Sequence, residues 1–240
     1  MVALVPNFIG AKNAIDAGAD KICLPLSVSE THSQANLRKS HDEVLEEIRK
    51  ISEYIEQLEK SQRPEFEGNL STAFGCTLEG KVSEDLVLKL GARMMELGCD
   101  EIGLSDTTGY ANPNQIKRLI RLLNKEVGQE NLKSMHLHNT RGLGLANALA
   151  SLEEGITTLD SSLGGIGGCP FAPGASGNIV TEDLVFMLDA MGVETGIDIN
   201  KLLEVTNKVQ SFIPDESIYG FTKDSGLPIG YEKGWGIVRS

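Results

Sequence analysis

The fold is indicated by the stretch Leu97-Gly98-Cys99-Asp100-Glu101-Ile102, in which a helix ends at a glycine and an apolar strand follows. The same pattern occurs twice more, in Ala17-Gly18-Ala19-Asp20-Lys21-Ile22 and in Glu154-Gly155-Ile156-Thr157-Thr158-Leu159. Glycine commonly follows the last turn of a helix because it adopts the left-handed conformation without a steric penalty. Helices alternating with short strands are typical of stacked β/α units, either closed into a barrel or forming a doubly wound sheet.

Working outward from these joints, we place six strands, which centre near Leu4, Leu24, Leu70, Ile102, Leu137 and Leu159. The expected bounds of the first four strands are 2–5, 21–26, 66–74 and 100–105. The fifth lies in the stretch that begins at Ser134, and the sixth is expected at 157–161. Helices are expected at 11–17, 83–97, 143–153, 184–191 and 199–211, with two longer ones after Ser40 and Asn112. Polar residues follow the strands, which favours a barrel with its chemistry at the strand carboxyl ends.

A closed barrel of this kind needs eight strands. We therefore predict an α/β fold, a TIM (β/α)8-type barrel that is incomplete at its N-terminus and has about six of the eight β/α units. Because the first strand begins at Val2, we expect the two other units before Met1. Such a sheet would expose unpaired edges and apolar surface. Residues 1–240 are expected to form a single partial catalytic domain, with an irregular, glycine-rich tail at 212–240.

The charge, the apolar runs and the cysteines of the sequence indicate which kinds of partner and which compartment to expect. The formal net charge of -12 comes from 34 acidic and 22 basic residues, without a basic run, which argues against a nucleic-acid partner. No apolar run is long enough to span a membrane, and the first residues do not look like a signal peptide. The four cysteines stand singly, which is typical of a reducing compartment, so we expect a cytoplasmic protein.

The fifth strand in chain order contains two histidines, in Ser134-Met135-His136-Leu137-His138-Asn139-Thr140-Arg141-Gly142. Side chains alternate along a strand, so His136 and His138 should project to the same side. Two neighbouring imidazoles can bind one divalent cation. A lone histidine is more often a hydrogen-bonded core residue, but this spacing at a strand end favours a metal site.

A second candidate region runs from Gly164 to Asn178 and has six glycines around Cys169. It could be a flexible linker with an incidental cysteine. Apolar residues and prolines are poor linker residues, however, so we favour a lid whose Cys169 thiol acts as acid or base when its pKa is lowered.

Other polar residues are weaker candidates. Asn178 offers an amide oxygen, which is a legitimate ligand for Mg²⁺ or Mn²⁺, although an asparagine alone is more often a cap. Asp106 follows a strand and could carry a proton or serve as a turn residue; the spacing leaves both open. The last candidates, for the substrate pocket and by position only, are Asn7, Arg141 and Ser161. Two imidazoles and an amide supply no anionic ligand, and the strands expected before Met1 are where we would place a carboxylate.

Several motifs together resemble the hydroxymethylglutaryl-CoA lyase family. The resemblance covers about residues 2 to 205 and is most specific in the loop around Cys169. The motifs are Leu4-Val5-Pro6-Asn7, Phe74-Gly75-Cys76, Glu79-Gly80-Lys81, Leu104-Ser105-Asp106-Thr107-Thr108-Gly109, His136-Leu137-His138-Asn139-Thr140-Arg141-Gly142, Gly167-Gly168-Cys169-Pro170-Phe171-Ala172-Pro173-Gly174-Ala175-Ser176-Gly177-Asn178 and Thr181-Glu182-Asp183-Leu184.

The resemblance implies cleavage of 3-hydroxy-3-methylglutaryl-CoA to acetyl-CoA and acetoacetate, a retro-Claisen reaction that needs Mg²⁺ or Mn²⁺ and belongs to leucine degradation. It implies that His136, His138 and Asn178 are metal ligands and that Cys169 handles the proton at the acetyl-CoA carbon. Asp106 would lie near the substrate hydroxyl and assist proton abstraction, with His136 sharing that task. The implied partner is an acyl-CoA, and a homodimer is the assembly that we consider.

The sequence also departs from the family pattern. The family's first strand carries an Arg-Asp pair that is absent here, so we expect these 240 residues alone to bind metal weakly and to be inactive, and the full-length product to be the enzyme. The run Asn139-Thr140-Arg141 is also a variant, which leaves the acyl group open. The alternatives are a lyase for a related substrate such as citramalyl-CoA, a condensing synthase that uses acetyl-CoA, or an inactive binding module.

Overall fold

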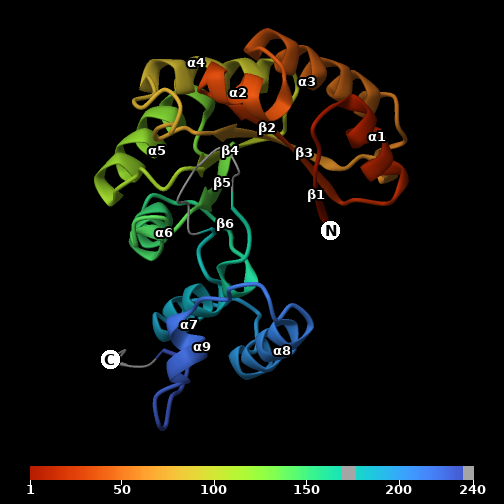
Figure 1. The fold of residues 1–240 in the computed structure, drawn as a ribbon. Helices are drawn as coiled ribbons and strands as arrows, with labels where there is room; N and C mark the ends of the chain where they lie inside the picture. The colour runs from red at the N-terminus through yellow and green to blue at the C-terminus, as the bar shows by residue number, and fades with distance from the viewer. Residues whose placement is uncertain (169–176, 235–240) are drawn as a thin grey trace.

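A computed structural model describes residues 1–168 and 177–234, and its centre is one sheet of six parallel strands (Figure 1). The strands pair in chain order, from β1 to β6, and form an open arc. Their bounds are β1 Val2–Leu4, β2 Lys21–Ser27, β3 Glu65–Ser71, β4 Glu101–Asp106, β5 Leu132–Leu137 and β6 Thr158–Asp160. The arc confirms the prediction of an incomplete TIM-type barrel with six strands.

Helices connect each strand to the next on the outer side of the arc, and a second group of helices follows β6 (Figure 1). The connecting helices are α1 Phe8–Asp16, α2 Glu30–Leu37, α3 His41–Glu56, α4 Glu84–Glu96, α5 Pro113–Val127 and α6 Gly144–Glu153. The second group is α7 Thr181–Ala190, α8 Ile199–Phe212 and α9 Phe221–Ser225, and short 3-10 turns occur at η1 Lys60–Gln62 and η2 Leu163–Gly165.

The glycine joints have the geometry that the sequence pattern predicts. Gly18, Gly98 and Gly155 follow α1, α4 and α6 with φ of 83°, 99° and 93°, in the left-handed region that favours glycine. The starts of α3 and α5 are fixed by capping boxes, Ser40 with Glu43 and Asn112 with Gln115.

Some predicted bounds were wrong. The helix expected at 11–17 begins earlier, at Phe8, because Asn7 caps it by accepting a hydrogen bond from the Gly10 amide at 2.9 Å. The strand expected to reach Phe74 ends at Ser71. Helix α2 was not predicted, since its sequence has little apolar periodicity. The tail predicted as irregular contains the five-residue helix α9.

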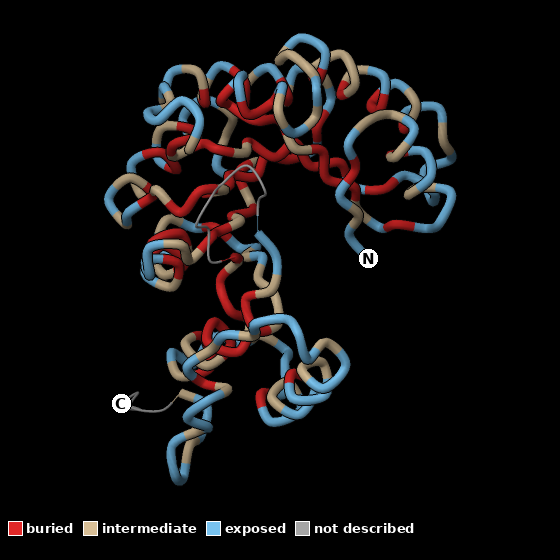
Figure 2. Tube along the Cα trace, viewed as in Figure 1, coloured by how far each residue is buried: buried red, intermediate tan, exposed pale blue. Residues whose placement is uncertain are grey.

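The two faces of the sheet differ in chemistry because side chains alternate along each strand. On β2, Ile22, Leu24 and Leu26 are fully buried under the helices, and Figure 2 shows the buried core along the sheet. Lys21, Cys23 and Pro25 line a cavity on the opposite, concave face. At the edge strand β1, Val2 and Leu4 are 65% and 73% exposed, which confirms the expected apolar exposure.

The concave face carries a cross-strand ion cluster near the amino ends of the strands. Lys21 Nζ lies 2.6 Å from Glu67 Oε2 and also pairs with Glu101, whose other oxygen lies 2.8 Å from Lys133 Nζ. These carboxylates raise the pKa of the Lys21 amine above its usual value, although burial alone would lower it. These ion pairs therefore link β2, β3, β4 and β5 across the concave face of the sheet.

Replacing Lys21 by Met should reduce the free energy of unfolding by about 3 kcal/mol, because Glu67 keeps a buried charge without its partner. Urea denaturation followed by circular dichroism measures the loss. Lys12→Met is the matched control, since Lys12 forms an exposed pair with Asp16 on α1, and its loss should leave the free energy of unfolding nearly unchanged. Equal denaturation midpoints for the two variants would contradict a stabilising role of the cluster.

Candidate active site

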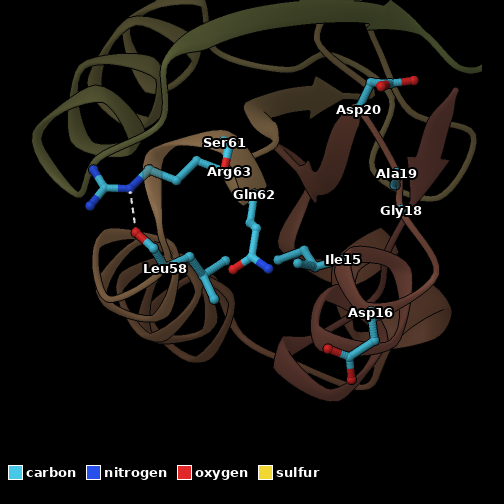
Figure 3. Close-up of a pocket in the computed structure, with 9 residues that line it drawn as sticks. All are labelled: Ile15, Asp16, Gly18, Ala19, Asp20, Leu58, Ser61, Gln62 and Arg63. Carbon is cyan, nitrogen blue, oxygen red and sulfur yellow. Dashed lines mark hydrogen bonds between the residues drawn. The ribbon is translucent and has the colours of Figure 1, made fainter.

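A cavity of about 490 Å³ lies on the concave face of the sheet, and two of the predicted site residues, His136 and Ser161, line it. It runs from Lys21 and Glu67 toward the carboxyl ends of the strands, where Thr107, His136 and Ser161 line it. A second cavity, of about 560 Å³, lies between the ends of α1 and α3 and contains Asp16, Asp20 and Arg63 (Figure 3). It contains none of the predicted site residues, and the concave cavity is therefore the candidate active site.

The paired histidines lie together at the end of β5. The Nε2 atoms of His136 and His138 are 3.1 Å apart, with ring centroids separated by 5.1 Å. This contact confirms that the two imidazoles share one side of the strand. Burial, and to a lesser degree the charge of His136, lowers the pKa of His138 to about 4. His138 is therefore neutral at pH 7 and offers a lone pair.

Asn178 is brought to this pair by backbone pairing. The segment 177–179 runs antiparallel to the end of β5, with Ile179 N donating to Leu137 O and Asn139 N donating to Gly177 O, both at 3.1 Å. The bridge places Asn178 directly opposite His138. Its side-chain Nδ2 donates to the Ile166 carbonyl at 3.0 Å, which fixes the orientation of the amide.

Two buried polar atoms of this group lack a hydrogen-bond partner among the described residues, Asn178 Oδ1 and His138 Nδ1. Such atoms cost free energy unless a ligand satisfies them. The 3.1 Å between the imidazole Nε2 atoms is also close to the spacing of two adjacent ligands around an octahedral cation with bonds of about 2.1 Å. The described residues include no group of three or more His, Cys, Asp or Glu side chains that could hold a metal. Two imidazoles and one amide nevertheless fit a divalent cation as three of its ligands.

Asp106 is buried at the end of β4 and does not line the cavity. It pairs with Leu137 in the sheet, whereas Ser105 and Thr107 line the cavity. Its carboxylate accepts hydrogen bonds from the amides of Tyr110 at 2.8 Å and Ala111 at 3.1 Å, so it holds the turn after β4. Burial raises the pKa of this carboxyl to about 6, against the opposing effect of these amides. The sequence left two roles open for Asp106. The hydrogen bonds give a physical basis to the role as a turn residue, and the raised pKa gives one to the role as a proton carrier.

The remaining candidates are placed as follows. Arg141 Nη1 donates to the carbonyls of Thr108 and Gly109 at 3.1 Å, and its guanidinium lies 4.5 Å from the Tyr110 ring centroid, so it joins the loops after β4 and β5. Ser161 lines the cavity and accepts a hydrogen bond from Thr181. Asn7 caps α1 and does not line the cavity. Cys169 lies outside the described residues.

Sequence reasoning missed Asp160. This residue ends β6, pairs with His136 in the sheet register and places Oδ2 3.6 Å from His136 Nδ1. An acidic residue at the carboxyl end of the strand after the histidine strand was the available signal. This signal points to His136 only when β5 and β6 are known to be neighbours in the sheet.

Comparisons with known proteins show which family the chain belongs to. A family model described as HMGL-like matches residues 2–209. The hydroxymethylglutaryl-CoA lyase YngG of Bacillus subtilis (strain 168) is 38% identical over 208 residues, which are 87% of this chain and 68% of that protein. The cytoplasmic 3-hydroxy-3-methylglutaryl-CoA lyase of Rattus norvegicus is 38% identical over 84% of this chain and 57% of its own length.

The chain is also similar to solved structures of HMG-CoA lyases. An HMG-CoA lyase from Acinetobacter baumannii, in complex with coenzyme A and 3-methylmalate, superposes with a TM-score of 0.87 at 40% identity, covering 96% of this chain and 73% of that one. The carboxyl transferase domain of Rhizobium etli pyruvate carboxylase shares the fold alone, with a TM-score of 0.65 at 15% identity. The chain belongs to the HMGL-like family, and it spans 57% to 68% of the two curated relatives named above.

The length and apolar character of the helices bear on whether they could cross a membrane. Within residues 1–168 and 177–234, none of the helices combines the length and the apolar character that crossing a bilayer requires.

The carboxyl of Asp106 should titrate with a midpoint near pH 6, because desolvation outweighs the amides that stabilise its charge. A ¹³C NMR pH titration measures this, with Asp106→Asn to assign the resonance and exposed Asp16 as the internal reference. Since the folded pKa exceeds the unfolded one, protonation favours the folded state, and wild type should gain stability relative to Asp106→Asn as the pH falls from about 6 to about 4. A midpoint below pH 4 would contradict the desolvation argument.

Proposed function

We propose that this protein is a hydroxymethylglutaryl-CoA lyase that cleaves 3-hydroxy-3-methylglutaryl-CoA to acetyl-CoA and acetoacetate. The observation that carries the proposal is that His136, His138 and Asn178 come together at the end of β5, where the buried Asn178 Oδ1 has no hydrogen-bond partner among the described residues. Family membership and the two curated lyases at 38% identity support the same reaction. So does the coenzyme A bound in the A. baumannii relative.

Within this proposal, His136, His138 and Asn178 would hold the divalent cation, either Mg²⁺ or Mn²⁺. When bound, the cation would act as a Lewis acid that stabilises the negative charge built up during retro-Claisen cleavage. Burial supports the role of His138, since the neutral form of its ring is the one that can donate a lone pair to a cation.

Protons would be handled by groups around this point. His136 lines the cavity and would contribute to removing the proton from the substrate hydroxyl. Asp106 is a second candidate, and its raised pKa would suit proton transfer near neutral pH. Cys169 would return a proton to the acetyl-CoA carbon, as expected from the sequence.

Arg141 and Ser161 would bind the acyl-CoA. Ser161 already lines the cavity, whereas Arg141 does not line it and joins the loops after β4 and β5. Asn7 would act only indirectly, through the start of α1, because its side chain caps that helix. A role in leucine degradation, a cytoplasmic location and a homodimeric assembly complete the proposal.

Replacing either histidine, as His136→Ala or His138→Ala, should weaken Mn²⁺ binding by more than about tenfold, because each change removes a ligand from the cation. Electron paramagnetic resonance of free Mn²⁺ measures the affinity. His41→Ala is the matched control, since His41 Nε2 donates a hydrogen bond to the Ser27 carbonyl at 2.9 Å, away from the site, and its loss should leave the affinity unchanged.

The reaction itself is tested by incubating the full-length product, which we expect to be the active form, with Mn²⁺ and each acyl-CoA. The expected products from 3-hydroxy-3-methylglutaryl-CoA are acetoacetate and acetyl-CoA. Chelation with EDTA should abolish product formation. Cleavage of citramalyl-CoA instead, or net condensation from acetyl-CoA, would replace the proposed reaction with one of the alternatives. Mn²⁺ binding that is indifferent to both histidine variants would refute the metal site.

Arg141→Ala should raise the KM for the acyl-CoA by about tenfold, because a charge-assisted hydrogen bond to an anionic ligand is worth about 1.5–3 kcal/mol. Steady-state kinetics measures the change. Arg93→Ala is the control, since Arg93 forms an exposed ion pair on α4. An unchanged KM, with lower thermal stability, would assign Arg141 only to joining the two loops.

A further inference from the structure

The ring of His136 lies between two neighbours that meet different nitrogens. Its Nε2 is 3.1 Å from His138 Nε2, and its Nδ1 is 3.6 Å from Asp160 Oδ2. Asp160 belongs to β6, where the parallel register pairs its Cα with that of His136. Both side chains line the same cavity. A carboxylate therefore faces the ring nitrogen that points away from the other histidine.

This placement affects which nitrogen carries the proton. A neutral imidazole has one N–H, on Nδ1 or on Nε2, and neighbouring groups decide between the two tautomers. A carboxylate only accepts hydrogen bonds, so its charge favours the proton on Nδ1. The 3.6 Å separation is longer than a hydrogen bond, and the effect at this distance is electrostatic attraction. The Nε2 lone pair then points to the side where His138 lies and, without a metal, can accept a hydrogen bond from His138 Nε2.

We propose that Asp160 is a positioning residue that holds His136 in the Nδ1–H tautomer and so presents Nε2 to the cation. The purpose of this arrangement rests on the proposed function, whereas the tautomer itself is a property of the protein without metal. A carboxylate behind a ligating imidazole is a general means of fixing the ring and raising its basicity.

Asp160 is not placed as a ligand of the same cation. Its carboxylate lies on the Nδ1 side of the His136 ring, whereas the His138 contact lies on the Nε2 side. The two histidines are also not equivalent. Among the described residues, His138 Nδ1 is buried without a partner, so the carboxylate orients one histidine of the pair only.

The test uses Asp160→Asn and Asp160→Ala, with Asp16→Asn and Asp16→Ala as matched controls, because the Asp16 and Asp160 side chains are equally exposed at 56%. Long-range ¹H–¹⁵N NMR of the metal-free protein reports the tautomer of His136. We expect the Nδ1–H form in wild type and in both controls, and a mixture of tautomers in both Asp160 variants. An unchanged tautomer in Asp160→Ala would overturn the proposal.

Mn²⁺ titration of the same proteins provides the second readout. Both Asp160 variants should bind Mn²⁺ about 10–100-fold more weakly than wild type, with the controls unchanged. A lower affinity without a change of tautomer would make Asp160 a ligand and overturn its positioning role. If wild type fails to bind Mn²⁺ while the tautomer still responds to Asp160, the tautomer inference stands and the proposed lyase function fails.

Discussion

The alternation of side chains across parallel strands is the constraint on which the rest of this structure depends. It sends Ile22, Leu24 and Leu26 to the convex side, where helices bury them, and Lys21, Cys23 and Pro25 to the concave side. A shift of one residue in register would exchange the two faces. The core and the polar cavity are therefore two results of the same register, and the cavity can be polar because the helices cover only the other face.

At the carboxyl end of the sheet, the site is assembled by main-chain pairing and then refined by side chains. The bridge between His138 and Asn178 brings together residues that are forty positions apart. Hydrogen bonding then orients each group, with the Ile166 carbonyl fixing the Asn178 amide and the β4 turn engaging the Asp106 carboxylate. Asn178 Oδ1, which has no hydrogen-bond partner among the described residues, belongs to the residue that this bridge places opposite His138.

Much of the fold could be predicted from the sequence because its signals are local. The glycine joints, the caps at Ser40 and Asn112, and the alternation around His136 each depend on a few neighbouring residues. The start of α1 was missed because Asn7 was considered for the pocket and not as a cap. Helix α2 was missed because its sequence lacks an apolar stripe.

The site was predicted less completely because its geometry is not local. The approach of Asn178 to His138 follows from strand pairing that the chain alone does not reveal, and it agrees with what the family resemblance implied. The orientation of Asp106 depends on how the strand ends and turns, and the sequence left its two roles equal. Asp160 becomes meaningful only from the register between β5 and β6.

The hydrogen bond from Asn178 to the Ile166 carbonyl has a consequence for how this family can vary. It ties together the residues on either side of the glycine-rich segment that contains Cys169. The spacing of the three candidate ligands is therefore set by atoms outside that segment. The number of residues between Ile166 and Asn178 can therefore change without altering the backbone pairing that places Asn178 opposite His138.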